Sequence, residues 1–145
     1  MRIDDEDREK EIKMAIANRK QIFPCDVKTI WDIVTDNRNY SWRSDLDRIE
    51  MTDDDNRFIE YTKDGFATIF TITEKEPYTR YEFNIESEFL SGSWIGLFKE
   101  SPEGTELDFT EEIRARGLSR RIMLPFYLKY QQKKYMEDLL KALKN

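Results

Sequence analysis

The sequence contains no histidine and a single cysteine among its 145 residues. Without histidine, the chain lacks the most common general base, the most common metal ligand and every Ser-His or Cys-His nucleophile arrangement. The single thiol, Cys25, excludes an internal disulfide and fits a reducing compartment. We therefore expect no metal and no cofactor, and carboxylates remain as the candidates for acid–base chemistry.

Glycine and long apolar runs are also scarce. The five glycines are scattered and form no phosphate-binding loop. No stretch approaches the ~20 apolar residues that a membrane span needs. The acidic start, MRIDDEDREKEIK, does not have the pattern of a signal peptide. We expect a cytoplasmic protein without a membrane span.

Charge is abundant, and most of it is negative. Charged residues make up 37% of the chain, and the formal net charge is −6. Such a chain repels the phosphates of nucleic acids unless one face is basic. The one basic concentration comprises Arg114, Arg116, Arg120, Arg121, Lys129, Lys133 and Lys134. We expect no nucleic-acid partner, and the chain can be a monomer or a homodimer.

The first third of the chain predicts a strand followed by short helices. Residues 1–10 are charged and aperiodic, which is typical of a flexible lead-in. Polar and apolar residues alternate from residue 11 to Phe23, which predicts a strand. Asp26 has the character of a helix N-cap, and a second short helix or turn is expected from Asn37 to Trp42. The apolar face of the first helix comprises Val27, Ile30, Trp31 and Val34.

The remainder predicts six strands and one long helix. The strands are expected at Leu46–Thr52, Arg57–Thr62, Phe66–Thr73, Arg80–Glu86, Ser93–Glu100 and Thr105–Arg116. Asp64-Gly65 is a hairpin signal between two of them. In the helix, an apolar stripe is expected at Ile122, Phe126, Tyr130, Lys133, Met136, Leu140 and Leu143, with Tyr127, Tyr135 and Leu139 beside it. Pro125 places the start of this helix at Leu124 or Pro125.

This order defines a fold class. We predict one α+β domain over residues 11–145, with the order β-α-α-β6-α. Its curved antiparallel sheet would wrap around the long C-terminal helix, because a meander of this length must curl and needs an apolar cover. This is a helix-grip fold.

The chain resembles the START-like superfamily, also called SRPBCC or Bet v 1-like, in its polyketide cyclase/dehydrase-like branch. The resemblance covers about residues 11 to 144. Pro24 followed by Val27, Ile30 and Trp31 matches the opening of the family's first helix. The remaining matches are the aromatic pair Tyr40 and Trp42, Gly104-Thr105 at the start of the last strand, and the long closing helix.

Three segments resemble a small bacterial subgroup of unassigned function. They are Ser41-Trp42-Arg43-Ser44-Asp45-Leu46, Trp94-x-Gly96-x-Phe98 and Lys129-Tyr130-Gln131-Gln132. The superfamily resemblance implies an internal cavity. Members bind lipids, sterols, polyketides or hormones in it, some catalyse cyclisation or hydration there, and others bind protein partners. The fold alone therefore does not decide between these functions.

Glu111 is the candidate catalytic residue. It lies on the same expected strand face as Leu107, Phe109 and Ile113, so its carboxyl would face an apolar cavity and have a raised pKa. A bulge that turns Glu111 outward, or a pair with an arginine, would remove this role.

Arg43 and Asp45 share one side of an extended segment next to Trp42. They would either bind a polar head group at the cavity mouth or pair with each other and fasten the loop to the sheet.

Aromatic residues supply most of the expected cavity wall, although core packing is an alternative role for each of them. The full set of candidate ligand-binding residues is Trp31, Trp42, Arg43, Asp45, Tyr61, Phe70, Tyr81, Phe83, Trp94, Phe109, Glu111, Phe126, Tyr127 and Tyr130.

Three functions agree with this sequence. The favoured one is noncatalytic binding or carriage of a small hydrophobic ligand, lipid-like or aromatic, because it requires only the cavity. A cyclase or hydratase would need polar groups that converge inside the cavity. A partner-binding module would need a large exposed apolar patch.

Overall fold

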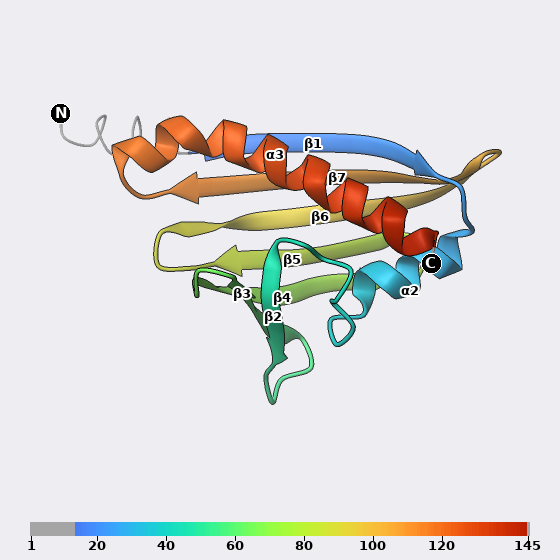
Figure 1. The fold of residues 1–145 in the computed structure, drawn as a ribbon, viewed down its shortest axis with the longest axis horizontal. Helices are drawn as coiled ribbons and strands as arrows, with labels where there is room; N and C mark the ends of the chain where they lie inside the picture. Colours follow the sequence, from blue (N-terminus) through green and yellow to red (C-terminus); the bar gives the residue numbers. More distant parts are fainter. Residues whose placement is uncertain (1–13, 145) are drawn as a thin grey trace.

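The computed structural model describes residues 14–144, so the charged lead-in expected at residues 1–10 lies outside the described part. Seven strands and two helices follow one another along it (Figure 1). Their bounds are β1 Met14–Phe23, α2 Val27–Thr35, β2 Leu46–Met51, β3 Arg57–Thr62, β4 Ala67–Glu76, β5 Arg80–Glu86, β6 Leu90–Ser101, β7 Gly104–Ala115 and α3 Leu118–Leu143.

All the strands belong to one antiparallel sheet with the order β1-β7-β6-β5-β4-β3-β2. The sheet is curved and does not close into a barrel, and α3 runs along its concave face (Figure 1). Strand β1 pairs with β7, so the first described strand lies beside the last one. The helix-grip α+β fold expected from the sequence is confirmed.

Helix α2 forms where the sequence predicts it. The Asp26 side chain accepts a hydrogen bond from the backbone N–H of Thr29 at 2.9 Å, which satisfies one of the free donors of the first turn. Ile30, Trp31 and Val34 are buried on one face of this helix.

The segment from Asn37 to Trp42, where a short helix or a turn is expected, makes turns. The Asp36 carboxylate accepts a hydrogen bond from the Arg38 N–H, and the Arg43 N–H bonds to the Tyr40 carbonyl. Local bonds of this kind compete with helix formation.

Helix α3 begins at Leu118, so the expected start at Leu124 or Pro125 is wrong. Pro125 lies inside the helix on its exposed side, where water can bond the carbonyl that the proline leaves unpaired. No helix within residues 14–144 is long and apolar enough to span a membrane.

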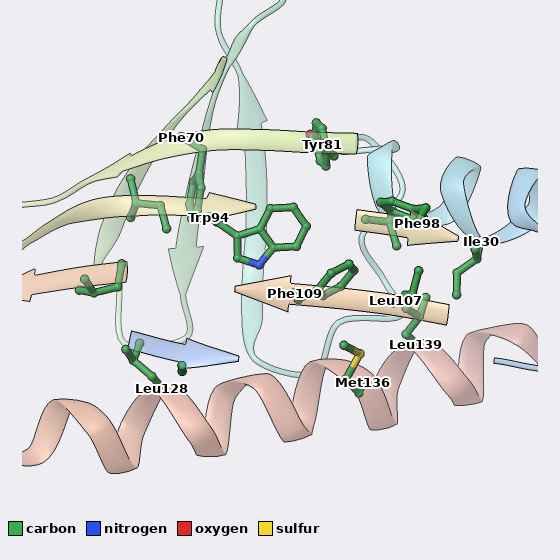
Figure 2. Packing of buried hydrophobic residues seen from close by; sticks show 14 of the residues in the cluster. Ile30, Phe70, Tyr81, Trp94, Phe98, Leu107, Phe109, Leu128, Met136 and Leu139 are labelled. Carbon is green, nitrogen blue, oxygen red and sulfur yellow. The ribbon is translucent and has the colours of Figure 1, made fainter. Parts of the chain in front are cut away.

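The buried face of α3 also differs from the expected stripe. Its buried residues are Leu124, Leu128, Gln132, Met136, Asp138 and Leu139, whereas Ile122, Phe126 and Tyr130 are exposed. The buried face includes a glutamine and an aspartate, so a prediction from hydrophobicity alone chose the wrong buried face for the first half of the helix. Figure 2 shows Leu128, Met136 and Leu139 directed from α3 toward the strands.

Candidate functional site

A cavity of about 190 Å³ lies between the concave face of the sheet and α3. Its walls come from α2, the loop before β2, strands β2–β7 and α3. Pockets for drug-sized ligands usually measure about 300–1,000 Å³, whereas an apolar cavity of about 150 Å³ is enough for benzene. The cavity therefore suits a molecule with about one ring.

Aromatic rings in continuous contact form much of the wall. Phe70 packs edge-on against Phe83 with ring centroids 5.1 Å apart, and Phe83 stacks on Trp94 at 4.7 Å. Trp94 then contacts Phe109 at 4.6 Å, and Phe109 contacts Tyr135 of α3 at 5.9 Å. Trp94 projects from β6 into the space between the sheet and α3 (Figure 2). The chain of rings thus runs from the sheet to the helix.

Gly96 makes room for the indole of Trp94. The two residues lie on the same face of β6, and a Cβ atom at position 96 would overlap the Trp94 ring. It would also stand 3.0 Å from the ring of Phe109. This explains the Trp94-x-Gly96 spacing in the sequence: the missing side chain of one residue accommodates the ring of the other.

Glu111 lines the cavity, as the alternation of β7 predicts. The β6–β7 register is unbroken along the whole pair and places Glu111 directly across from Trp94. No bulge therefore turns the carboxyl outward. Within residues 14–144, no protein group makes a hydrogen bond or a salt bridge to this carboxyl.

The cavity changes the acidity of Glu111. Burial disfavours the charged form and raises the pKa of Glu111 to about 7, with a further contribution from the negative charge of Glu60. The positive charge of Arg43 opposes this change. A carboxyl with this pKa holds and releases a proton near neutral pH, which is the property required of a general acid–base group.

Arg43 is the centre of a half-buried charged cluster in the cavity wall. Its guanidinium makes a two-pronged salt bridge to Asp45, with N–O distances of 3.0 and 2.9 Å. The same guanidinium lies 3.5 Å from the Glu60 carboxylate and 4.8 Å from the ring centroid of Tyr135. Arg43 and Asp45 thus fasten their loop to β3 and α3, and both also line the cavity.

The cluster shifts the acidity of its own members. Burial works against the charged guanidinium, but the charges of Glu60 and Asp45 outweigh it and raise the pKa of Arg43. Burial also raises the pKa of Glu60, against the influence of Arg43. Burial raises the pKa of Tyr135 as well, so its phenol stays neutral.

A second contact holds the same loop on α3. The buried Asp138 carboxylate accepts hydrogen bonds from the Ser44 N–H at 2.8 Å and from the Ser44 hydroxyl at 2.7 Å. The loop that carries Arg43 and Asp45 is therefore fixed at both the sheet and the helix.

Nine of the fourteen expected ligand-binding residues line the cavity. They are Arg43, Asp45, Phe70, Tyr81, Phe83, Trp94, Phe109, Glu111 and Tyr127. A role for these nine residues in ligand binding stays a prediction.

Three expected aromatics pack elsewhere. Trp31 is buried against Tyr81 and Phe98, with ring centroids 6.0 and 4.8 Å apart, so it belongs to the core beneath α2. Trp42 contacts the ring of Tyr135 from outside the cavity. Tyr61 lies outside the cavity wall, and the Arg48 guanidinium lies over its ring at 3.9 Å. Placing Trp31 and Tyr61 in the cavity wall was wrong, and Trp42, expected to bind ligand, does not line the cavity either.

Phe126 and Tyr130 do not line the cavity either. Their side chains are 68% and 59% exposed. The positions two residues further along, Leu128 and Gln132, face the sheet instead. The expectation is wrong because the most hydrophobic stripe in this half of the helix faces away from the sheet.

Sequence reasoning missed Glu60 and Gln132, together with the central position of Tyr135. Glu60 carried the same signal as Glu111, since it is a carboxyl two residues after an apolar position, here the buried Phe58. Gln132 donates a hydrogen bond to the Ala17 carbonyl of β1 at 3.0 Å. No sequence signal marks that contact, because it depends on how α3 is rotated.

The acidic residues of the site do not form a metal centre. Among residues 14–144, no group of three or more histidine, cysteine, aspartate or glutamate side chains is arranged to hold a metal ion.

Comparison with solved structures shows the same fold in bacterial proteins. A conserved protein from Geobacillus kaustophilus is 16% identical with a TM-score of 0.76, covering 90% of this chain and 95% of that one. A START superfamily protein from Mycobacterium smegmatis is 10% identical with a TM-score of 0.74, covering 90% and 97%. At such identities the likeness concerns the fold alone.

A third structure comes from a biosynthetic pathway. The di-domain ARO/CYC protein StfQ of the steffimycin pathway is 14% identical with a TM-score of 0.73. The match covers 94% of this chain but 52% of StfQ, so this chain corresponds to about half of that protein. No curated protein sequence matches the chain.

The family comparison covers nearly all of the described chain. Residues 14–145 match the model of the family described as polyketide cyclase / dehydrase and lipid transport. The matched range contains the sheet, both helices and every cavity residue described above. The chain therefore belongs to the polyketide cyclase/dehydrase and lipid transport family.

Proposed function

We propose that this protein is a noncatalytic binder or carrier of a small hydrophobic ligand held in the cavity between the sheet and α3. The aromatic-walled cavity of about 190 Å³ is the observation that carries the proposal. Family membership supports ligand binding in a hydrophobic pocket at a general level.

The size of the cavity narrows the ligand class. A long acyl chain needs more space than about 190 Å³, whereas a single ring with a short substituent fits. Edge-on and stacked rings such as Trp94 and Phe109 also provide the contacts that a flat molecule prefers. We therefore favour a compact aromatic ligand over a lipid.

Native mass spectrometry of freshly purified protein tests this function. A matched pair of variants controls for the fold: Thr68→Phe adds a ring inside the cavity wall, and Thr73→Phe adds one at an exposed position of the same strand. We expect a small molecule to co-purify with the wild type and Thr73→Phe but not with Thr68→Phe. A wild type without any bound molecule, or equal loading of both variants, would contradict the proposal.

Acid–base catalysis is the second candidate function, and Glu111 is the observation that favours it. Its carboxyl lines the cavity, has no protein partner within residues 14–144 and has a pKa of about 7. If the protein catalyses dehydration, the wild type and Glu111→Gln will co-purify with molecules that differ in mass by one water. Identical bound molecules would exclude such a reaction.

A further inference from the structure

The charges in the cavity wall do not balance. Within the described part of the chain, the charged residues that line it are three carboxylates, Asp45, Glu60 and Glu111, and one guanidinium, Arg43. Asp45 and Glu60 both contact Arg43, so this cluster already has one excess negative charge when all its groups are ionised. Ionised Glu111 adds a second. Excess charge away from water is unfavourable, and a ligand of opposite charge would relieve it.

The cavity wall offers little to an anion. Among residues 14–144, Arg43 is the one cationic side chain of this wall, and it already binds two carboxylates. The lining amides of Asn37, Gln131 and Gln132 already donate to Tyr81, Tyr127 and Ala17, respectively. The Trp94 indole N–H makes no hydrogen bond to another described residue, but it is neutral. An anionic head group would meet carboxylates without a free cation to offset them.

We propose that the ligand is a compact ring-bearing amine, bound as its ammonium cation with Glu111 as the counter-ion. This inference rests on the proposed binding function and adds the chemical class of the ligand. Glu111 is the carboxyl available for this role, since Asp45 and Glu60 are engaged with Arg43. Its position across from Trp94 places the carboxyl beside the aromatic wall.

The aromatic wall favours the same ligand class. Ring faces attract a nearby cation, most strongly those of tryptophan and tyrosine, and the attraction increases away from water. Trp94 and Tyr135 both line the cavity, and Phe109 lies between them, 4.6 and 5.9 Å from their ring centroids. A ring with a one-carbon ammonium arm can therefore contact aromatic faces and a carboxylate within one small space.

Binding of such a ligand should depend on pH. With a pKa of about 7, Glu111 is half protonated near neutrality, and it becomes a full counter-ion as pH rises. The titratable or charged groups of the cavity wall around it are Glu60 from β3, Tyr81 from β5, Arg43 and Asp45 from the loop before β2, and Tyr127 and Tyr135 from α3. The tyrosines stay neutral, because burial raises the pKa of all three. Ammonium affinity should therefore increase from about pH 6 to about pH 8.

Three probes of nearly equal size and different charge test the ligand class: benzylammonium, benzyl alcohol and benzoate. The readout is the indole N–H resonance of Trp94 in NMR titrations, with Trp31 and Trp42 as internal references outside the cavity wall. At about pH 8 we expect benzylammonium to bind about ten-fold more tightly than benzyl alcohol, a ratio equivalent to one charge-assisted hydrogen bond. Benzoate should bind more weakly than both.

Glu111→Gln removes the proposed counter-ion and keeps the size of the side chain. Benzyl alcohol carries no charge and should still bind to this variant, which would show that its cavity is intact. Its preference for benzylammonium should be lost, together with the pH dependence. Glu112→Gln is the matched control, because it changes the adjacent but exposed carboxyl of β7 and should behave as the wild type does.

The probes separate failure of the ligand class from failure of the binding function. If benzyl alcohol binds as tightly as benzylammonium, the cavity binds rings but the ammonium inference is wrong. If the preference for benzylammonium persists in Glu111→Gln, the counter-ion is assigned to the wrong residue. If none of the probes shifts the Trp94 resonance, the cavity does not admit a single-ring molecule, and both proposals fail.

Discussion

At the scale of single residues, the raised pKa of Glu111 makes the stability of the protein depend on pH. Its pKa is about 7 in the folded protein and near 4.5 in a solvated chain. Between these two values the unfolded chain has lost the proton and the folded protein still holds it. Stability therefore falls as pH rises across this interval, and the loss is complete above about pH 7.

Glu111→Gln should remove this loss. We expect the variant to be close to the wild type in unfolding free energy at about pH 4.5 and more stable by up to about 3 kcal/mol at about pH 8. Urea denaturation at the two pH values measures the difference. Glu112→Gln provides the baseline, and an effect of Glu111→Gln that is the same at both pH values would show that Glu111 has an ordinary pKa.

Arg43 should be far more important for stability than an arginine on the surface. Arg43→Ala leaves the carboxylates of Asp45 and Glu60 half-buried without their cation, which we expect to cost about 3–5 kcal/mol. The control is Arg80→Ala, whose salt bridge to Glu82 is more exposed and should contribute less than about 1 kcal/mol. If urea denaturation shows equal losses of unfolding free energy in Arg43→Ala and Arg80→Ala, the charged cluster around Arg43 is solvated.

At the scale of elements, the loop before β2 depends on α3 for its position. Asp138→Ala removes the carboxylate oxygen that accepts both hydrogen bonds from Ser44 and should lower the unfolding free energy by about 1–3 kcal/mol. Amide hydrogen exchange at Ser44 should accelerate in the same variant. Glu137→Ala, an exposed neighbour on α3, should change neither quantity. Unchanged exchange at Ser44 would show that the salt bridges of Arg43 suffice to hold the loop.

The strands could be predicted from the sequence, because each is long enough to show alternation and most end at a clear turn. The position of Glu111 followed from the same alternation. The orientation of α3 could not be predicted, since its exposed residues Ile122, Phe126 and Tyr130 are more hydrophobic than the buried Gln132. Local hydrophobicity does not include the hydrogen bond from Gln132 to β1 that this orientation allows.

The part of the site that could not be predicted from the sequence depends on contacts between distant segments. Glu60 and Tyr135 meet Arg43 only after the sheet has curved and α3 has packed on it. The residues next to Glu60 and Tyr135 in the sequence do not indicate a contact with Arg43.

At the scale of the whole molecule, the sheet joins the first and the last strand of the described chain. Because β1 pairs with β7 along its full length, the sheet is complete only when residues far apart in the sequence have met. Contacts of this kind slow folding. We expect refolding in milliseconds to seconds, measured by stopped-flow tryptophan fluorescence. If the full signal change were complete before mixing ends, the β1–β7 pair would not be required in the folding transition state.

The absence of a side chain at Gly96 has a consequence for protein engineering. The Trp94 indole, which lines the cavity, occupies the space where that side chain would be. Exchanging Trp94 for a smaller residue would extend the cavity toward Gly96 without altering the strand register. The same scaffold could then be redesigned for bicyclic ligands by changing one ring, while the hydrogen bonds of the sheet stay as they are.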